Sequence, residues 1–276
     1  MRLVLVSDTH MRHSELVLPE GDILLHSGDL TLSGNMAELK SAAAWLRKQT
    51  TRFKHVVVIA GNHDFALEHF MKEGAEGLAK ELFYPSIYLR DTGVTLDGVT
   101  CYGSPWQPRF CNWAFNADRG ADIKTYWNAI PKNLDVLLTH GPPYHVLDWV
   151  GKARVGCDDL RNALDRVQPK VHVFGHIHAA HGKAQTFAVG GATTQCYNAA
   201  VVGEDYKLDP KHHPWVLDYD GKTFTEVPGI YETYGEDGIE PRGCAANGLA
   251  DPATGAERQP RTPRSQPSTE NGQRRP

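Results

Sequence analysis

The sequence contains no apolar run that approaches the ~20 consecutive residues needed for a membrane-spanning helix. It also lacks a strong excess of either charge, since 29 Lys and Arg residues face 33 Asp and Glu residues, giving a formal net charge of −4. This balance gives no sign of a surface for nucleic acid or for anionic lipid. We therefore expect neither a nucleic-acid polymer nor a membrane as a partner, and the composition leaves the oligomeric state open.

Cysteine is scarce, with five residues in the chain and no Cys-x-x-Cys spacing. An odd number of cysteines without paired spacing favours free thiols in a reducing compartment over a disulfide framework. The first apolar run, Leu3–Val6, begins so early that it leaves no room for a cleaved signal peptide. These features together predict a cytoplasmic protein.

Aromatic residues are absent after Tyr234, where Gly, Pro, Ser and Arg dominate the composition. A segment with so few apolar side chains cannot bury enough surface to offset the entropy of its chain. We predict one domain over residues 1–234 and a disordered C-terminal tail over residues 235–276. The alternative for the tail is a regulatory or docking segment.

Five short apolar runs each end in a cluster of residues that commonly bind metals. Short apolar runs bounded by glycine and polar residues are typical of buried strands. In open α/β sheets, functional side chains gather beyond the carboxyl ends of the strands, so the five clusters can converge on one crevice. The runs are Leu3–Val6, Ile23–Leu25, Val56–Ile59, Val136–Leu138 and Val171–Phe174.

The clusters supply two aspartates, one asparagine and four histidines, and this set of oxygen and nitrogen donors suits Mn, Fe, Zn or Mg. Seven side chains are too many for one tetrahedral ion but fit two ions that share a bridging carboxylate. Two ions ~3.5–4 Å apart acidify a bridging water and clamp the oxygens in a displacement at phosphorus. The predicted chemistry is phosphoester hydrolysis by attack of a metal-bridging hydroxide on phosphorus. The seven residues are Asp8, His10, Asp29, Asn62, His140, His176 and His178.

Each of these residues also has a simpler interpretation when it is considered alone. Asp8 and Asp29 could cap helices, and Asn62 could simply occupy a turn. His140 could be an ordinary loop histidine before Gly-Pro-Pro. All of these interpretations would have to hold at once, and the ordered set therefore favours a metal site.

Between the clusters, the apolar spacing predicts an alternation of helices and strands, and hence an α/β fold with mixed sheets. Three helices are expected, over Asn35–Gln49, Leu67–Leu82 and Asp158–Val167. Later strands are expected over Phe187–Val189 and Asn198–Val202, followed by a hairpin of Trp215–Tyr219 and Thr223–Val227 around Asp220-Gly221.

The five motifs, in their order along the chain, resemble those of the calcineurin-like metallophosphoesterase superfamily. They are Asp8-x-His10, Gly28-Asp29, Gly61-Asn62-His63-Asp64, His140 and Gly175-His176-x-His178. The resemblance implies a four-layer α/β/β/α sandwich of two mixed sheets. It also implies two divalent metal ions bridged by Asp29. The first ion would be held by Asp8, His10 and His178, and the second by Asn62, His140 and His176.

The same resemblance gives His63 a catalytic role and not the role of a metal ligand. His63 would stabilise charge on the substrate phosphate or protonate the leaving oxygen, both of which are common roles of histidine. Asp64 would accept a hydrogen bond from His63 and fix the tautomer of its ring.

The segment from Tyr102 to Asn116 is rich in aromatic residues. It could bind substrate by stacking on a base and contacting a phosphate, or it could pack its own rings over the edge of a sheet. Its Gly-Ser-Pro-Trp-Gln-Pro block resembles the metallophosphoesterase-domain-containing brain-protein subgroup, which is similar to class III cyclic nucleotide phosphodiesterases. The candidate substrate-binding residues are Trp106, Arg109, Phe110 and Trp113.

The expected function is that of a hydrolase acting on ester bonds, specifically a phosphodiesterase for small substrates such as cyclic nucleotides. Two alternatives stay open. One is a phosphomonoesterase acting on a protein or a small molecule, and the other is a catalytically silent binding scaffold. The presence of His63 and of every ligand of the motif set favours an enzyme.

Overall fold

The computed structural model describes residues 1–188 and 191–228. The predicted domain boundary at Tyr234 and the predicted tail lie outside these residues. Within residues 1–188 and 191–228, no helix is long and apolar enough to cross a membrane.

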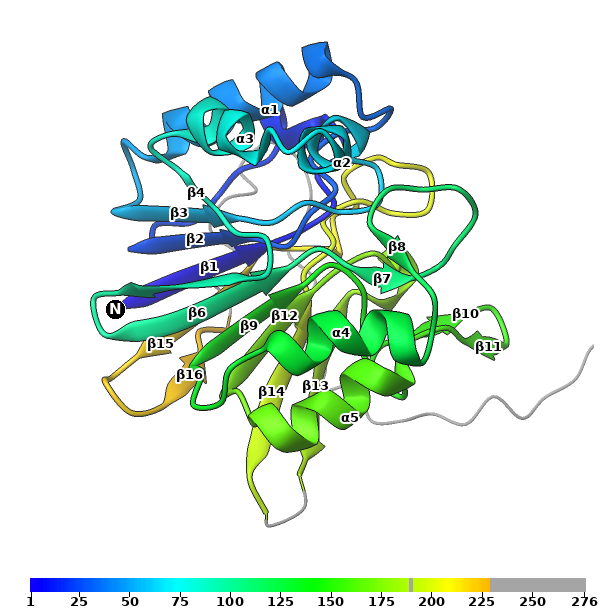
Figure 1. The fold of residues 1–276 in the computed structure, drawn as a ribbon. Coiled ribbons are helices and arrows are strands. Elements are labelled where there is room, and N and C mark those ends of the chain that lie inside the picture. Colours follow the sequence, from blue (N-terminus) through cyan, green and yellow to red (C-terminus); the bar gives the residue numbers. More distant parts are fainter. Residues whose placement is uncertain (189–190, 229–276) are drawn as a thin grey trace, which may run out of the picture. The chain divides into compact units, whose positions relative to one another are not determined.

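The first sheet is mixed and has six strands, in the order β16-β15-β1-β2-β3-β4 (Figure 1). Its strands β1 to β4 are parallel, while β15 and β16 join them in antiparallel fashion. The strands are β1 (Arg2–Val6), β2 (Ile23–His26), β3 (His55–Val58), β4 (Ile87–Tyr88), β15 (Trp215–Tyr219) and β16 (Phe224–Glu226).

The second sheet also has six strands, in the order β13-β14-β12-β9-β6-β5. Four central strands are parallel, and the edge strands β13 and β5 are antiparallel to their neighbours. The strands are β5 (Thr92–Leu96), β6 (Val99–Ser104), β9 (Val136–Thr139), β12 (Val171–Phe174), β13 (Gly182–Phe187) and β14 (Thr193–Asn198). Two small pairs stand apart, β7 (Gln107–Pro108) with β8 (Asn116–Ala117), and β10 (Trp149–Val150) with β11 (Ala153–Arg154).

Helices cover the outer face of each sheet, so the domain has four layers (Figure 1). Along β1, Leu3 and Leu5 pack between the two sheets, while Val4 and Val6 pack in the cluster that includes the helices. Strands buried on both faces are typical of sheets covered by helices. The structure therefore confirms the predicted α/β/β/α sandwich. The helices are α1 (Met36–Gln49), α2 (Phe65–Lys72) and α3 (Glu76–Phe83) over the first sheet, and α4 (Ala121–Ala129) and α5 (Asp158–Val167) over the second.

The helix predicted over Leu67–Leu82 is in fact two helices, α2 and α3. Gly74 lies between them with a φ of +67°, a conformation that glycine adopts at little cost and that ends a helix. Helix α1 begins where the sequence predicts it, because the Asn35 side chain accepts hydrogen bonds from the backbone N–H groups of Ala37 and Glu38.

Two strand predictions differ from the structure. No strand spans Asn198–Val202: β14 ends at Asn198, and Ala200 and Val202 form only isolated bridges, with Ser7 and Leu208. The strand expected over Phe187–Val189 is β13, which ends at Phe187, and Val189 lies outside the described residues. The hairpin predicted near the end of the domain is confirmed as β15 and β16.

Candidate metal centre

The five motifs lie in loops that follow parallel strands of both sheets. Asp8 follows β1, Asp29 follows β2 and Asn62 follows β3, while His140 follows β9 and His176 follows β12. The carboxyl ends of these strands point toward the same end of the sandwich (Figure 1). Loops from the two sheets therefore meet there, as expected for functional residues of α/β folds.

Neither Asp8 nor Asp29 caps a helix. Asp8 accepts hydrogen bonds from the backbone N–H of His176, with N–O distances of 3.1 and 3.0 Å. Asp29 accepts one from the backbone N–H of His63 at 2.8 Å. The helix-capping interpretation of both residues is therefore wrong, and each carboxylate instead ties two motifs together.

Four of the motif residues have left-handed backbone conformations, which are costly for residues other than glycine. Their φ angles are +53° at Asp8, +39° at His10, +55° at Asp29 and +67° at His176. Strain of this kind persists only where surrounding contacts hold it, and it concentrates at functional sites. The strained backbone conformations thus occur at the same residues whose side chains are the candidate metal ligands.

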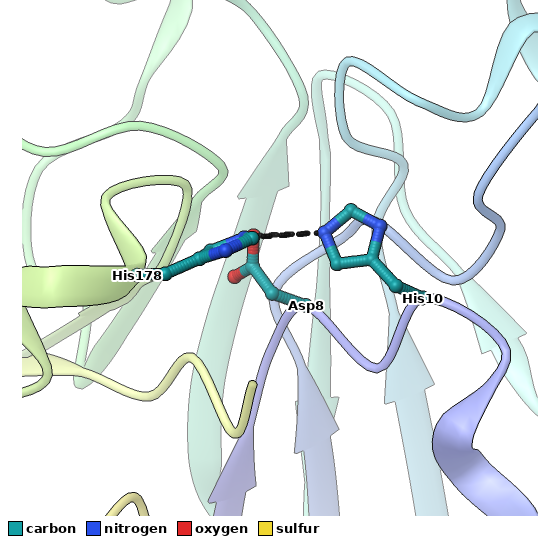
Figure 2. Close-up of side chains that lie close together, drawn as sticks. All are labelled: Asp8, His10 and His178. Carbon is teal, nitrogen blue, oxygen red and sulfur yellow. Dashed lines mark hydrogen bonds and ion pairs between the residues drawn. The ribbon is translucent and has the colours of Figure 1, made fainter. Parts of the chain in front are cut away.

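Asp8, His10 and His178 form the first ligand cluster, in which the two imidazole rings point toward each other beside the carboxylate (Figure 2). The Nε2 atoms of His10 and His178 are 3.2 Å apart, and His178 Nε2 lies 3.3 Å from Asp8 Oδ1. Each ring donates its Nδ1–H to a backbone carbonyl, that of Thr31 for His10 and that of Gly203 for His178. The Nε2 atoms of both rings therefore face one another, and in their neutral forms they would offer two lone pairs to a bound cation. Burial disfavours the charged form of His178, but the Asp8 carboxylate prevails and raises its pKa, so without metal this Nε2 favours a proton that a cation would displace.

His140 and Asn62 form the second cluster around the other side of Asp29. His140 Nε2 lies 2.8 Å from Asn62 Oδ1 and 3.4 Å from Asp29 Oδ2. The His140 ring donates its Nδ1–H to the carbonyl of Ser27, so its Nε2 atom also faces the site. The same Asp29 oxygen is 3.5 Å from His10 Nε2, which places this carboxylate between the two clusters.

His176 completes the set of predicted ligands. The centroid of its ring is 5.0 Å from that of His140, and its side chain lines the cleft above the two clusters. All seven residues predicted from the sequence therefore converge on one place.

The charges of the centre suit a divalent cation. Burial opposes ionisation of Asp8 and Asp29, but the neighbouring histidines hold the pKa of both carboxylates well below its usual range. Burial lowers the pKa of His10 to about 4 and that of His176 to about 3, which keeps both rings neutral. Burial also disfavours the charged form of His140, yet the Asp29 carboxylate prevails and raises its pKa to about 9. A metal ion would displace that proton.

Two glycines let the chain approach the carboxylates closely. A Cβ atom at Gly175 would lie 1.8 Å from Asp8 Oδ2, and one at Gly61 would lie 2.3 Å from Asp29 Oδ1. Both distances are far shorter than van der Waals contact, so any side chain at these positions must displace a carboxylate.

We expect Gly175→Ala to lower metal affinity by roughly 10- to 100-fold, the scale of changes to groups that orient metal ligands. The added methyl group would push Asp8 away from His178, while the overall fold remains. Titration of the metal-free protein with Mn²⁺ by calorimetry measures this. Gly77→Ala is the matched control, because a Cβ atom at Gly77 meets nothing within 4 Å. Equal affinity in both variants would contradict the prediction.

The predicted hydrogen bond between His63 and Asp64 is not formed. His63 donates its Nδ1–H to the backbone carbonyl of Leu32 at 2.7 Å. The Asp64 carboxylate instead accepts hydrogen bonds from the backbone N–H groups of Leu30, Thr31 and Gly61. Asp64 is thus buried and links the loops after β2 and β3 by hydrogen bonds. The tautomer of the His63 ring is fixed by the Leu32 carbonyl and not by Asp64.

A cleft of about 580 Å³ opens over the metal centre, and Arg109, Phe110 and Trp113 line it. The Trp113 ring lies 4.1 Å from the His63 ring, and the Phe110 ring lies 6.2 Å from the His176 ring. Arg109 forms an exposed ion pair with Asp118. Three of the four predicted substrate-binding residues therefore stand beside the site.

Trp106, the fourth, does not line this cleft. Its side chain is only 6% exposed, its ring stacks on Tyr126 at 3.8 Å, and its Nε1–H donates to Asp91 at 2.9 Å. Trp106 therefore packs within the protein and does not bind substrate. This agrees with the alternative interpretation, in which the aromatic segment packs its own rings.

Tyr206 is a site residue that the sequence did not reveal. Its ring stands edge-on to the rings of His10 and His178, with centroids 4.8 and 5.3 Å away, and it lines the cleft. Arg12 holds this position by donating to the Tyr206 carbonyl. Tyr206 lies in a polar loop far from any motif, so no sequence signal pointed to it. Ile177 also lines the cleft, and its place within a motif could have indicated this.

The comparisons with known proteins agree with this geometry. A model of the family described as calcineurin-like phosphoesterase matches residues 1–180. The human and mouse proteins named metallophosphoesterase domain-containing protein 1 are each 42% identical over 241 residues, covering 79% of this chain and 70% of theirs. The solved structure of a Thermus thermophilus protein, TT1561, shares the fold, with a TM-score of 0.52 at 12% identity, covering 82% of this chain and 97% of that one. The chain belongs to the calcineurin-like phosphoesterase family, hydrolases that use divalent metal ions to cleave phosphoesters.

Proposed function

We propose that the protein is a phosphodiesterase for small substrates and that it uses two divalent ions. The observation that carries this proposal is the position of Asp29, which has one oxygen within 3.5 Å of His10 Nε2 and within 3.4 Å of His140 Nε2. A carboxylate placed in this way can be shared between two ions.

Asp8, His10 and His178 would hold one ion, and Asn62, His140 and His176 would hold the other. These donors are oxygen and nitrogen atoms without thiolate, a set that suits Mn²⁺, Fe, Zn²⁺ or Mg²⁺. When bound, the ions would supply an acidified water and would neutralise charge on the phosphate. The protein side chains orient the substrate and move protons around it.

The contacts of His63 support a role for this residue in acting on the substrate. Its Nδ1–H is bound to the Leu32 carbonyl, which leaves Nε2 for contact with a phosphate oxygen or the leaving group. Packing between His10 and Trp113 further fixes the ring, with centroids at 4.5 and 4.1 Å. A protonated Nε2 would donate to the leaving oxygen, and this is the role that we propose.

A diester requires room for an organic group on each side of phosphorus. The cleft provides this room, and its walls include the aromatic side chains of Phe110, Trp113 and Tyr206. Mostly apolar clefts with a few placed polar groups are typical of sites for small organic ligands. These walls support a diester with a nucleobase, such as a cyclic nucleotide, over a bare monoester.

The deciding experiment compares bis-p-nitrophenyl phosphate, p-nitrophenyl phosphate and cyclic nucleotides as substrates of the metal-reconstituted protein. Faster cleavage of the diesters supports the proposal. A clear preference for the monoester would make the protein a phosphatase. Absence of metal-dependent turnover on all of them would favour a silent scaffold.

Trp113→Ala and Phe110→Ala should each lower kcat/KM more for 3′,5′-cyclic AMP than for methyl p-nitrophenyl phosphate. Stacking on a base contributes ~1–3 kcal/mol, so the difference should be about 5- to 150-fold. Kinetics on both substrates measure it. Trp106→Ala is the control, because this buried ring should lower the melting temperature and affect both substrates alike. Equal losses for Trp113→Ala would mean that Trp113 only supports the loop.

A further inference from the structure

Two arginines on the wall of the cleft have no part in the proposed chemistry. Arg119 lies just before α4, and Arg154 ends β11. Both line the same cleft as His63 and His176. Neither belongs to a metal motif or to the aromatic segment that suggested a base-binding role.

The Arg154 guanidinium is held in a fixed orientation. Its Nη1 donates to Asp148 Oδ1 at 2.7 Å, and its central carbon lies 4.2 Å from the centroid of the Trp149 ring. Asp148 is completely buried, and its other oxygen accepts from the backbone N–H groups of His145 and Gly156. The carboxylate cannot turn away without losing these bonds, so it positions the arginine.

Arg119 is attached to the same wall. Its Nη1 and Nη2 donate to the carbonyls of Gly156 and Val155, each at 2.8 Å, and its Nη1 lies 3.5 Å from Asp158. Gly156 and Val155 follow Arg154 directly in the chain. The two cations therefore belong to one rigid part of the cleft, with 45% of the Arg119 side chain and 24% of the Arg154 side chain exposed.

Each guanidinium keeps donors for a ligand. Within the described part of the chain, no protein group accepts a hydrogen bond from Arg154 Nε and Nη2 or from Arg119 Nε. The planar fork of arginine matches the paired oxygens of a carboxylate or a phosphate. A side chain that is already ordered loses little entropy when such a group binds.

We propose that Arg119 and Arg154 form a subsite for a second acidic group, a carboxylate or phosphate carried by an organic arm of the phosphodiester substrate. This inference rests on the proposed function, because it assumes a phosphodiester substrate and places the acidic group of one of its organic arms at these two arginines. The subsite selects substrates that carry an additional negative charge beyond the scissile diester.

The test uses 4-nitrophenyl phenyl phosphate and its 4-carboxyphenyl and 4-phosphonophenyl analogues, which differ only in the second acidic group. In the metal-loaded wild type, we expect higher kcat/KM for the acidic analogues. Arg154→Gln and Arg119→Gln should each remove roughly 10- to 100-fold of kcat/KM for the acidic substrates, the scale of hydrogen bonds to charged groups. The parent diester, which has no second acidic group, should be cleaved as before. The analogue that loses more identifies carboxylate or phosphate as the preferred group.

Arg166→Gln is the matched control. Arg166 also donates from Nη1 and Nη2 to two carbonyls, those of Ile130 and Trp127, but it lies outside the cleft. Equal losses in Arg154→Gln and Arg166→Gln, or equal losses on the parent diester and on its acidic analogues, would overturn the subsite.

Failure of the proposed function has a different signature, because the wild type would then prefer p-nitrophenyl phosphate to all three diesters or cleave none of these substrates. In that event, calorimetric binding of phenylphosphonate and 4-carboxyphenylphosphonate to the metal-loaded protein still tests the subsite. Tighter binding of the second ligand, lost in Arg154→Gln, supports it. Equal binding of the two ligands to the wild type would overturn it.

Discussion

Replacing His63 with alanine should lower kcat of the metal-loaded protein roughly 10²–10⁴-fold while leaving its metal content unchanged. The loss arises because alanine has no ring nitrogen that could donate a proton to the leaving oxygen. Metal content should survive because the backbone N–H of residue 63, which binds Asp29 at 2.8 Å, is kept in the variant. Steady-state kinetics on a diester and elemental analysis of the purified protein measure both quantities.

Two further variants distinguish loss of the catalytic acid from other effects of replacing a histidine. His63→Gln can still donate to the Leu32 carbonyl but cannot act as an acid, so we expect a loss similar to that of alanine. His69→Ala removes an exposed histidine of α2 outside the cleft and should change neither turnover nor metal content. Normal turnover of His63→Ala would contradict the assigned role. Loss of metal would instead make His63 a ligand, since its ring nitrogen lies within 4.8 Å of ligand atoms of His10 and Asp29.

The convergence of the seven candidate metal ligands could be predicted from the sequence because each of them lies in the loop after a short apolar strand. Strand direction in a parallel sheet fixes where such residues lie, and both sheets present these ends together (Figure 1). Asp8 and His178 meet in this way although they come from opposite ends of the motif region. The position of the candidate ligands thus depends on the order and direction of the strands, and the pattern of apolar runs predicts both.

Details that depend on loop conformation could not be predicted. The acceptor for the His63 ring is the carbonyl of Leu32, and backbone atoms carry no residue-specific signal. Tyr206 reaches the site through a loop with left-handed backbone at its own position, where φ is +58°. Trp106 and Trp113 lie in one aromatic segment, yet only contacts with Asp91 and Tyr126 decide that Trp106 turns inward.

The strands of the second sheet were also harder to predict from the sequence than those of the first. Its edge strand β5 (Thr92–Leu96) is largely exposed and contains Gly93, so it lacks the apolar run typical of a buried strand. Strand β6 (Val99–Ser104) runs into the aromatic segment, for which the sequence predicted no strand. Tertiary pairing with β9 overrides this local preference.

Asp29→Asn should cost the protein both metal ions, whereas Asp8→Asn should cost mainly one. Asparagine keeps the shape of Asp29 and an oxygen that can accept from His63, but it removes the charge shared by the two clusters. It also removes the carboxylate that does most to raise the pKa of His140, so burial of that ring would then be opposed only by the Asp8 charge and the Ser27 carbonyl. We expect metal affinity to fall by more than the ~10–100-fold that is typical of changes to orienting groups.

Metal stoichiometry after dialysis against limiting Mn²⁺ measures the difference between the two variants. Because bound metal stabilises the folded protein, the rise in melting temperature on adding Mn²⁺ should also disappear in Asp29→Asn. Asp135→Asn provides the control, since this mostly buried carboxylate binds Lys170 and Thr100 away from the site. It should keep both ions even if it lowers the melting temperature. Retention of two ions per chain in Asp29→Asn would show that this carboxylate is not shared, and the dinuclear arrangement would then have to be abandoned.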